Sequence, residues 1–226
     1  MARGYPYKLC DASRHPPALS PDAGADDDAE IPWVLLERKA YVVADCTNAT
    51  TAYSNSRCGN QIQFTFNAAR PPRVSHLCVY CRGHHTDVDE DEMIPIAPEV
   101  IATDGDLVLL RIVVSPEEKD ITGDADLYVY RPAGTGGPSL THLRRPPGDE
   151  YLSPYEVGLL CFNAKRDDDE PEDDQFYMVA SLCEDRLSMP GGRGRFILYV
   201  PLELHAQFLD YDGRVCGRTT DPAISS

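Results

Sequence analysis

The segment best equipped for chemistry places two cysteines next to two histidines. It reads Cys78-Val79-Tyr80-Cys81 and is followed by His84 and His85. Zinc binds thiolate and imidazole groups, so Cys78, Cys81 and His84 would supply three of its four usual ligands. A structural zinc site normally has a second paired knuckle, and the other cysteines are scattered singly. We therefore expect thiols at the end of a strand and no metal site, with a small zinc-stabilised module kept as an alternative.

A second segment, Asp87 to Glu92, resembles the start of a calcium-binding loop. Such a loop needs Gly at its sixth position and a bidentate Glu at its twelfth. This chain has Glu92 and Pro98 at those positions. The pattern therefore predicts a solvated acidic loop instead of a calcium site.

The usual signatures of catalysis and of nucleotide binding are absent from the sequence. There is no G-x-S-x-G, no H-E-x-x-H and no Walker loop. The glycine-rich stretches Gly134 to Pro138 and Gly191 to Gly194 are typical of turns. We predict no catalytic residue and no cofactor. An enzyme whose site is assembled from residues scattered along the chain stays open as an alternative.

Negative charge is concentrated in three short clusters. Asp22 to Glu30, Asp87 to Glu92 and Asp167 to Asp174 hold 17 of the 37 acidic residues, and they contain no Lys or Arg. The rest of the chain has 20 acidic and 21 basic residues, so its formal charge is close to zero. Such acidic runs favour solvated loops, with an acidic docking surface for a basic partner as the alternative. Nucleic-acid binding needs clustered Lys and Arg, so we expect none.

The apolar stretches are too short to cross a membrane as helices. The first nine residues lack the apolar centre of a signal peptide. We therefore expect a cytoplasmic or nuclear protein that makes no membrane contact. In that compartment the eight cysteines should be thiols, and the sequon at Asn48 should be unused.

Short apolar segments separated by Gly, Pro and polar residues predict many strands. Gln61 to Phe66 alternates polar and apolar residues, which indicates a strand with one buried face. Leu107 to Val114 is apolar on both faces, which indicates a central strand. Further strands are expected at 31–36, 40–44, 74–80, 100–103, 127–130, 157–162, 176–182 and 195–200. The polar stretch 47–60 is expected to be a loop, and 201–208 a short helix.

These elements predict a mostly β protein, with many short antiparallel strands in a sandwich or a partial propeller-like array. Residues 1–30 are expected to be a disordered acidic arm, 31–200 the β-rich domain and 201–226 a flexible tail. The strand aromatics are expected to pack in the core, or else to form a partner-binding patch. They are Trp33, Tyr41, Phe64, Phe66, Tyr80, Tyr128, Tyr130 and Tyr177.

Several of these segments resemble, in order, the domain of unknown function 1618 family, which is greatly expanded in grasses. The similar segments are Pro32 to Arg38, Asn48 to Ala52, Pro71 to Cys81, Asp106 to Arg111, Leu127 to Arg131, Pro138 to Leu140 and Val157 to Leu160. The resemblance covers roughly 31–200. It implies a β-rich plant protein related to F-box-associated propeller domains, and it supplies no catalytic residues. No F-box helices precede Trp33.

After Val200 the chain departs from the family pattern, which continues into a Ser-rich, Trp-containing hairpin and further strands. The resemblance therefore implies a truncated product that holds only the N-terminal part of the family architecture. Such a product would have an open edge strand instead of a closed propeller. It would then have no independent function, which is one further alternative.

Our functional prediction is a non-catalytic interaction or scaffold domain. It would bind another protein through its acidic loops or through the exposed strand edge.

Overall fold

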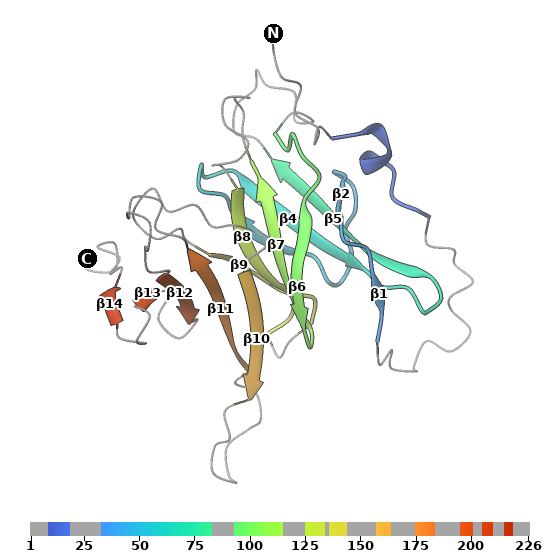
Figure 1. Ribbon diagram of the computed structural model, residues 1–226. Coiled ribbons are helices and arrows are strands. Elements are labelled where there is room, and N and C mark those ends of the chain that lie inside the picture. Colours follow the sequence, from blue (N-terminus) through green and yellow to red (C-terminus); the bar gives the residue numbers. More distant parts are fainter. Residues whose placement is uncertain are drawn as a thin grey trace. The chain divides into compact units, whose positions relative to one another are not determined.

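The fold is known from a computed structural model, and Figure 1 shows that strands dominate it. The structure describes residues 9–18, 33–82, 93–114, 125–133, 136–143, 157–163, 175–183, 195–200, 205–209 and 215–218. The chain divides into two compact units. One comprises Met1–Val100 and Val108–His142, and the other comprises Ile101–Leu107 and Leu143–Ser226. Among the described residues the one helical element is a 3-10 turn, so the protein is mostly β, as predicted.

The first sheet is built around its longest strand, β5. Its strands are β1 (Leu35–Leu36), β2 (Tyr41–Val42), β3 (Ala52–Asn55), β4 (Gln61–Asn67) and β5 (Val74–Arg82). The order is β1-β5-β4-β3, and β2 also pairs with β5. The β3–β4 and β4–β5 pairs are antiparallel hairpins, whereas β1 and β2 run parallel to β5. The Pro71–Pro72 bond between β4 and β5 is cis.

The second sheet consists of β6 (Glu99–Asp104), β7 (Leu107–Val113), β8 (Ala125–Arg131) and β9 (Ser139–Leu143), in that order. Strand β7 pairs antiparallel with β8. Six of the seven β7 residues are buried, so both faces of this strand are covered. The central position predicted from its continuous apolar run is confirmed.

Apolar side chains from both sheets form one core. Phe64 of β4 lies at its centre with 0% exposure, and its ring centroid is 6.0 Å from that of Tyr128 and 5.9 Å from that of Tyr130, both on β8. Ile62, Leu77, Val79, Leu110 and Ile112 belong to the same cluster. The period-2 pattern of β4 thus buries one face of the first sheet against the second, which is the packing of a sandwich.

The third sheet contains β10 (Val157–Asn163), β11 (Gln175–Cys183), β12 (Arg195–Val200), β13 (His205–Leu209) and β14 (Val215–Arg218). They follow one another in sequence order, and each pair is antiparallel. The helix predicted at 201–208 is wrong, because β13 occupies its second half as an extended strand. Strands β13 and β14 lie in the segment expected to be a tail. The predicted loop at 47–60 was also partly wrong, since it contains β3.

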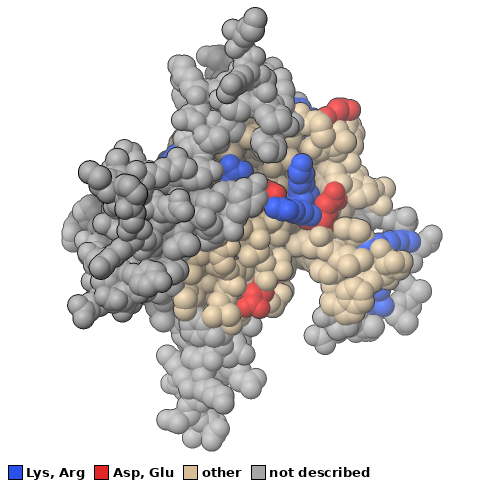
Figure 2. Space-filling model, in the orientation of Figure 1, with Lys and Arg blue, Asp and Glu red and all other residues tan. Residues whose placement is uncertain are grey.

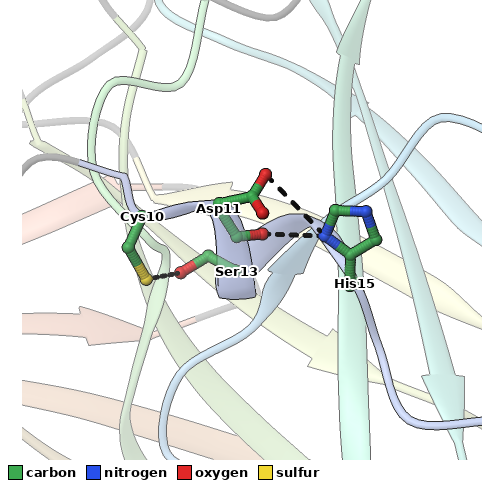
Figure 3. A network of polar contacts seen from close by, with 4 residues as sticks. All are labelled: Cys10, Asp11, Ser13 and His15. Atoms are coloured by element: carbon green, nitrogen blue, oxygen red, sulfur yellow. Dashed lines mark hydrogen bonds and ion pairs between the residues drawn. The ribbon is translucent and has the colours of Figure 1, made fainter.

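Residues 9–18, within the expected acidic arm, form an ordered turn. Element η1 (Asp11–Arg14) is a single 3-10 turn, and the Leu9 amide donates to the Pro95 carbonyl at 2.8 Å. Figure 3 shows how side chains brace this turn. The Cys10 and Ser13 side chains hydrogen-bond at 3.2 Å, and His15 Nδ1 lies 2.9 Å from the Asp11 carbonyl. The Ser13 hydroxyl lowers the pKa of the exposed Cys10 thiol.

The predicted core role holds for some of the aromatic residues and fails for others. Phe64, Tyr128 and Tyr130 are fully buried, and Phe66 is partly buried against the core. Trp33, in contrast, is 59% exposed. It precedes β1, a two-residue strand at the end of the sheet order, so the sheet has no inward position to offer it.

Replacing Tyr130 by Phe should lower the free energy of unfolding by about 1 kcal/mol. The Tyr130 hydroxyl donates to the Thr50 carbonyl at 2.6 Å, and burial raises the pKa of this phenol to about 12. The variant keeps the ring and loses only the hydrogen bond. Urea unfolding followed by circular dichroism measures the change. An unchanged midpoint would contradict a contribution of this bond to stability.

Candidate functional site

Among the described residues, the β2–β3 connection covers part of the outward face of the first sheet, and the rest of that face forms a groove. The groove has a volume of about 460 Å³ and is lined by Ala44, Asp45, Tyr53, Gln61, Gln63, Tyr80 and Arg82. Every lining residue belongs to the first compact unit. Volumes of a few hundred cubic ångströms are typical of binding sites, although most such sites are more apolar than this one.

Strand register brings the groove residues together. Tyr53 of β3 lies opposite Gln63 of β4, which lies opposite Tyr80 of β5. Gln61 lies opposite Arg82 in the next row on the same face. Directly paired residues on one face have Cβ atoms about 5 Å apart, so these side chains form a continuous polar and aromatic surface.

The connection between β2 and β3 forms one wall of the groove. The Cys46 carbonyl accepts hydrogen bonds from Gln63 Nε2 at 3.1 Å and from Thr65 Oγ1 at 2.7 Å. Asn48 Nδ2 and Thr50 Oγ1 both donate to the Phe66 carbonyl at 2.9 Å. The connection therefore covers the part of the face that contains the buried Thr65. It leaves the row formed by Tyr53, Gln63 and Tyr80 as the floor of the groove.

The turn between β3 and β4 closes the near end of the hairpin. The Ser56 amide donates to the Asn60 carbonyl at 2.8 Å, and the Gly59 amide donates to the Ser56 carbonyl at 2.9 Å. Gly59 has a φ of 83°, a conformation that costs glycine little and other residues more. This geometry directs the amide of Arg57 toward the second sheet, where it donates to Asp126 Oδ2 at 3.2 Å.

A buried acid lies beside a histidine at that end of the sandwich. Asp126 is 3% exposed, and its Oδ1 lies 3.6 Å from Nε2 of His142, whose side chain is 19% exposed. The His142 ring stacks on Tyr128 with a centroid separation of 4.9 Å. Burial by itself would raise the pKa of Asp126, but the contacts with His142 and with Arg57 outweigh it and lower the pKa.

The Asp126–His142 pair could transfer protons in principle. None of the described hydrogen bonds joins His142 to a serine, threonine or cysteine that it could activate. Sequence analysis did not single this pair out. A signal was present, because Asp126 is in phase with Tyr128 and Tyr130, which face the core.

The two cysteines of the Cys-x-x-Cys segment both lie on β5, but they serve different faces. Cys81 belongs to the core cluster, whereas Cys78 lies opposite Thr65 on the outward face. Successive strand residues alternate between faces, so a separation of three directs these two thiols apart. Burial raises the pKa of Cys81 to about 12. His84 lies outside the described residues.

Several other predicted features also lie outside the described residues. They are the acidic clusters Asp22 to Glu30, Asp87 to Glu92 and Asp167 to Asp174, and the turn Gly191 to Gly194. Within the described ranges, no group of three or more His, Cys, Asp or Glu side chains is arranged to hold a metal ion. No described helix is long and apolar enough to span a membrane.

On the face shown in Figure 2, the described surface is mainly uncharged, and its few basic and acidic side chains are interspersed. Arg38 and Glu99 form one of the described ion pairs, with their Nε and Oε1 atoms 2.8 Å apart. This agrees with a body that is close to neutral once the three acidic clusters are set aside.

No family model, no curated protein and no solved structure matches this chain. The resemblance to the domain of unknown function 1618 family therefore stays a prediction.

Proposed function

We propose that this chain is a non-catalytic protein-interaction domain that binds an extended, polar segment of a partner protein in the groove on the first sheet. The observation that carries the proposal is the lining of the groove by Tyr53, Tyr80, Gln61, Gln63 and Arg82. Tyrosine and arginine are enriched in protein interfaces, where they combine large contact area with polar groups.

The lining matches the chemistry of a peptide main chain. Glutamine amides offer both donors and acceptors, so Gln61 and Gln63 are suited to the alternating C=O and N–H groups of an extended backbone. Arg82 and Asp45 supply one positive and one negative charge for side chains or termini. The exposed Tyr53 ring, 54% accessible, offers an apolar face to pack against.

The position of β3 adds a second reason to favour an extended partner. Strand β3 stands at the end of the sheet order, and within the described part of the chain it pairs with β4 alone. A peptide can add to such an edge by main-chain hydrogen bonds while its side chains enter the adjacent groove. The sequence also led us to expect binding through an exposed strand edge, but it did not place that edge at β3. Binding through the acidic clusters is a separate part of the proposal.

Selection from a display library of random peptides, with the full chain as target, should enrich polar peptides that bind in the groove. Each of the variants Tyr53→Ala and Tyr80→Ala should weaken a selected peptide at least tenfold, which corresponds to about 1.4 kcal/mol. Fluorescence polarisation with the labelled peptide measures the affinity.

Val74→Ser is the matched control. Val74 is an exposed side chain on the same face of β5 as Tyr80, about 20 Å away along the strand. It should leave the affinity unchanged. Equal losses of affinity in all three variants would refute the groove as the binding surface. So would selected peptides whose affinity neither tyrosine variant changes. A further variant with Asp167 to Asp174 replaced by Ser and Gly reports on the acidic cluster.

Membership of the grass-expanded family, with a cytoplasmic or nuclear location, belongs to the same proposal. The short similar segments, which occur in the family's order between roughly 31 and 200, support this membership.

A further inference from the structure

Two thiols that are distant in sequence meet beneath the wall of the groove. Asn67 Nδ2 donates to Cys46 Sγ at 3.1 Å and to Cys78 Sγ at 3.3 Å. The Cys46 thiol also lies near enough to contribute to the raised pKa of the Cys78 thiol. Both cysteines are free, so this is a dithiol held around one amide group.

The elements that carry the two cysteines are fixed independently. Cys78 is held in the middle of β5, opposite Thr65 on one side and Tyr41 on the other. The Cys46 main chain is held by hydrogen bonds from Gln63 and Thr65 to its carbonyl. The fold therefore brings the two sulfur atoms together. Their proximity does not depend on a chance encounter of mobile segments.

We propose that Cys46 and Cys78 form a reversible disulfide when the protein meets a low-molecular-weight disulfide such as oxidised glutathione. The inference is independent of what the groove binds.

The unequal exposure of the thiols sets the order of the steps. Cys46 is partly exposed and Cys78 is buried, so Cys46 meets the oxidant first. Its sulfur attacks one sulfur of glutathione disulfide, which forms a mixed disulfide and releases one glutathione thiolate. The Cys78 sulfur then attacks Cys46 Sγ, forms the protein disulfide and displaces the second glutathione.

The overall exchange is balanced. Two protein thiols are oxidised to one disulfide, and one glutathione disulfide is reduced to two glutathione molecules, which take up the two protons. Burial, and secondly the Cys46 thiol, raise the pKa of Cys78. The second step is therefore expected to be slow, and the experiment needs long incubation.

The bridge would tie the β2–β3 connection covalently to β5. Ala44 and Asp45, which line the groove, precede Cys46 directly. Oxidation would thus add a covalent link to the hydrogen bonds that hold the groove wall in the reduced protein.

Peptide mapping of the full chain tests the proposal. The native protein is incubated with excess oxidised glutathione, alkylated and digested with trypsin without reduction. Cleavage after Lys39, Arg57, Arg73 and Arg82 gives residues 40–57, which contain Cys46, and 74–82, which contain Cys78 and Cys81. We expect these two peptides joined, with fragmentation assigning the bond to Cys78.

The joined peptide should be lost in Cys46→Ser and kept in Cys58→Ser, which removes an exposed thiol in the β3–β4 turn. A bond from Cys46 to Cys81 would overturn the proposal. So would glutathione that stays on Cys46 while Cys78 remains open to alkylation after unfolding. The wild-type map gives the answer even if a variant fails to fold.

Discussion

Replacing Phe64 by Ala should lower the free energy of unfolding by about 3–5 kcal/mol. Phe64 has no exposed surface and is the side chain of β4 that contacts Tyr128 and Tyr130 across the sandwich. Alanine would leave a cavity between two sheets whose strands cannot close around it, because main-chain ladders hold each of them. A loss of this size is a large part of the stability of most domains.

Denaturant unfolding followed by far-ultraviolet circular dichroism measures this effect. Because the chain divides into two compact units, two transitions are possible, and the shift should fall in the one that reports on the first unit. Tyr53→Ala is the control, since it truncates a ring on the opposite, open face of the same sheet. It should cost less than about 1 kcal/mol. Similar costs for both variants would refute the assignment of the two faces.

His142→Ala should destabilise the protein by about 1–3 kcal/mol at neutral pH. The variant leaves the Asp126 carboxylate buried, with the Arg57 amide as its one described hydrogen-bond donor. The Arg57 amide alone offsets less of the desolvation cost of this buried carboxylate than Arg57 and His142 do together. Urea midpoints of the wild type and the variant give the difference. An unchanged midpoint would show that His142 stabilises the Asp126 carboxylate no more than water does.

The same pair predicts how stability depends on pH. The pKa of Asp126 is lowered in the folded protein, so the unfolded chain takes up this proton first as the pH falls. The contribution of Asp126 is therefore fully present above about pH 4 and is lost as the pH drops below the unfolded-state value of about 3.9.

Asp126→Asn should remove this part of the acid sensitivity while it keeps the shape of the side chain. Unfolding curves of both proteins between pH 3 and pH 7 should differ most near neutral pH and converge toward acid. Parallel profiles would contradict the lowered pKa.

The local sequence pattern was enough to predict those strands in which the order of polar and apolar residues matches their burial. The alternation in β4 and the apolar run of β7 placed both strands correctly, because each side chain's environment follows from its position in a pleated strand. Strand β3 was missed because only Ala52 of its four residues is buried. Its extended conformation comes from pairing with β4, which lies beyond local sequence.

The groove could not be predicted from the sequence, for a related reason. Tyr53, Gln63 and Tyr80 share a row only because two hairpins set their register, and no spacing along the chain records that register. The Cys46–Cys78 contact likewise depends on where the β2–β3 connection lies. The Cys-x-x-Cys spacing, in contrast, was visible in the sequence and drew attention to a pair whose thiols lie on opposite faces.

The parallel pairing of β1 and β2 with β5 sets an order in which this sheet can be assembled. Leu35–Leu36 and Tyr41–Val42 pair with residues 74–75 and 78–79, whereas β3, β4 and β5 join through short connections. On a chain made from its N-terminus, β1 and β2 are synthesised first but have no strand to pair with until β5 has followed. The β4–β5 hairpin is therefore the template, and the earliest strands are the last to join it.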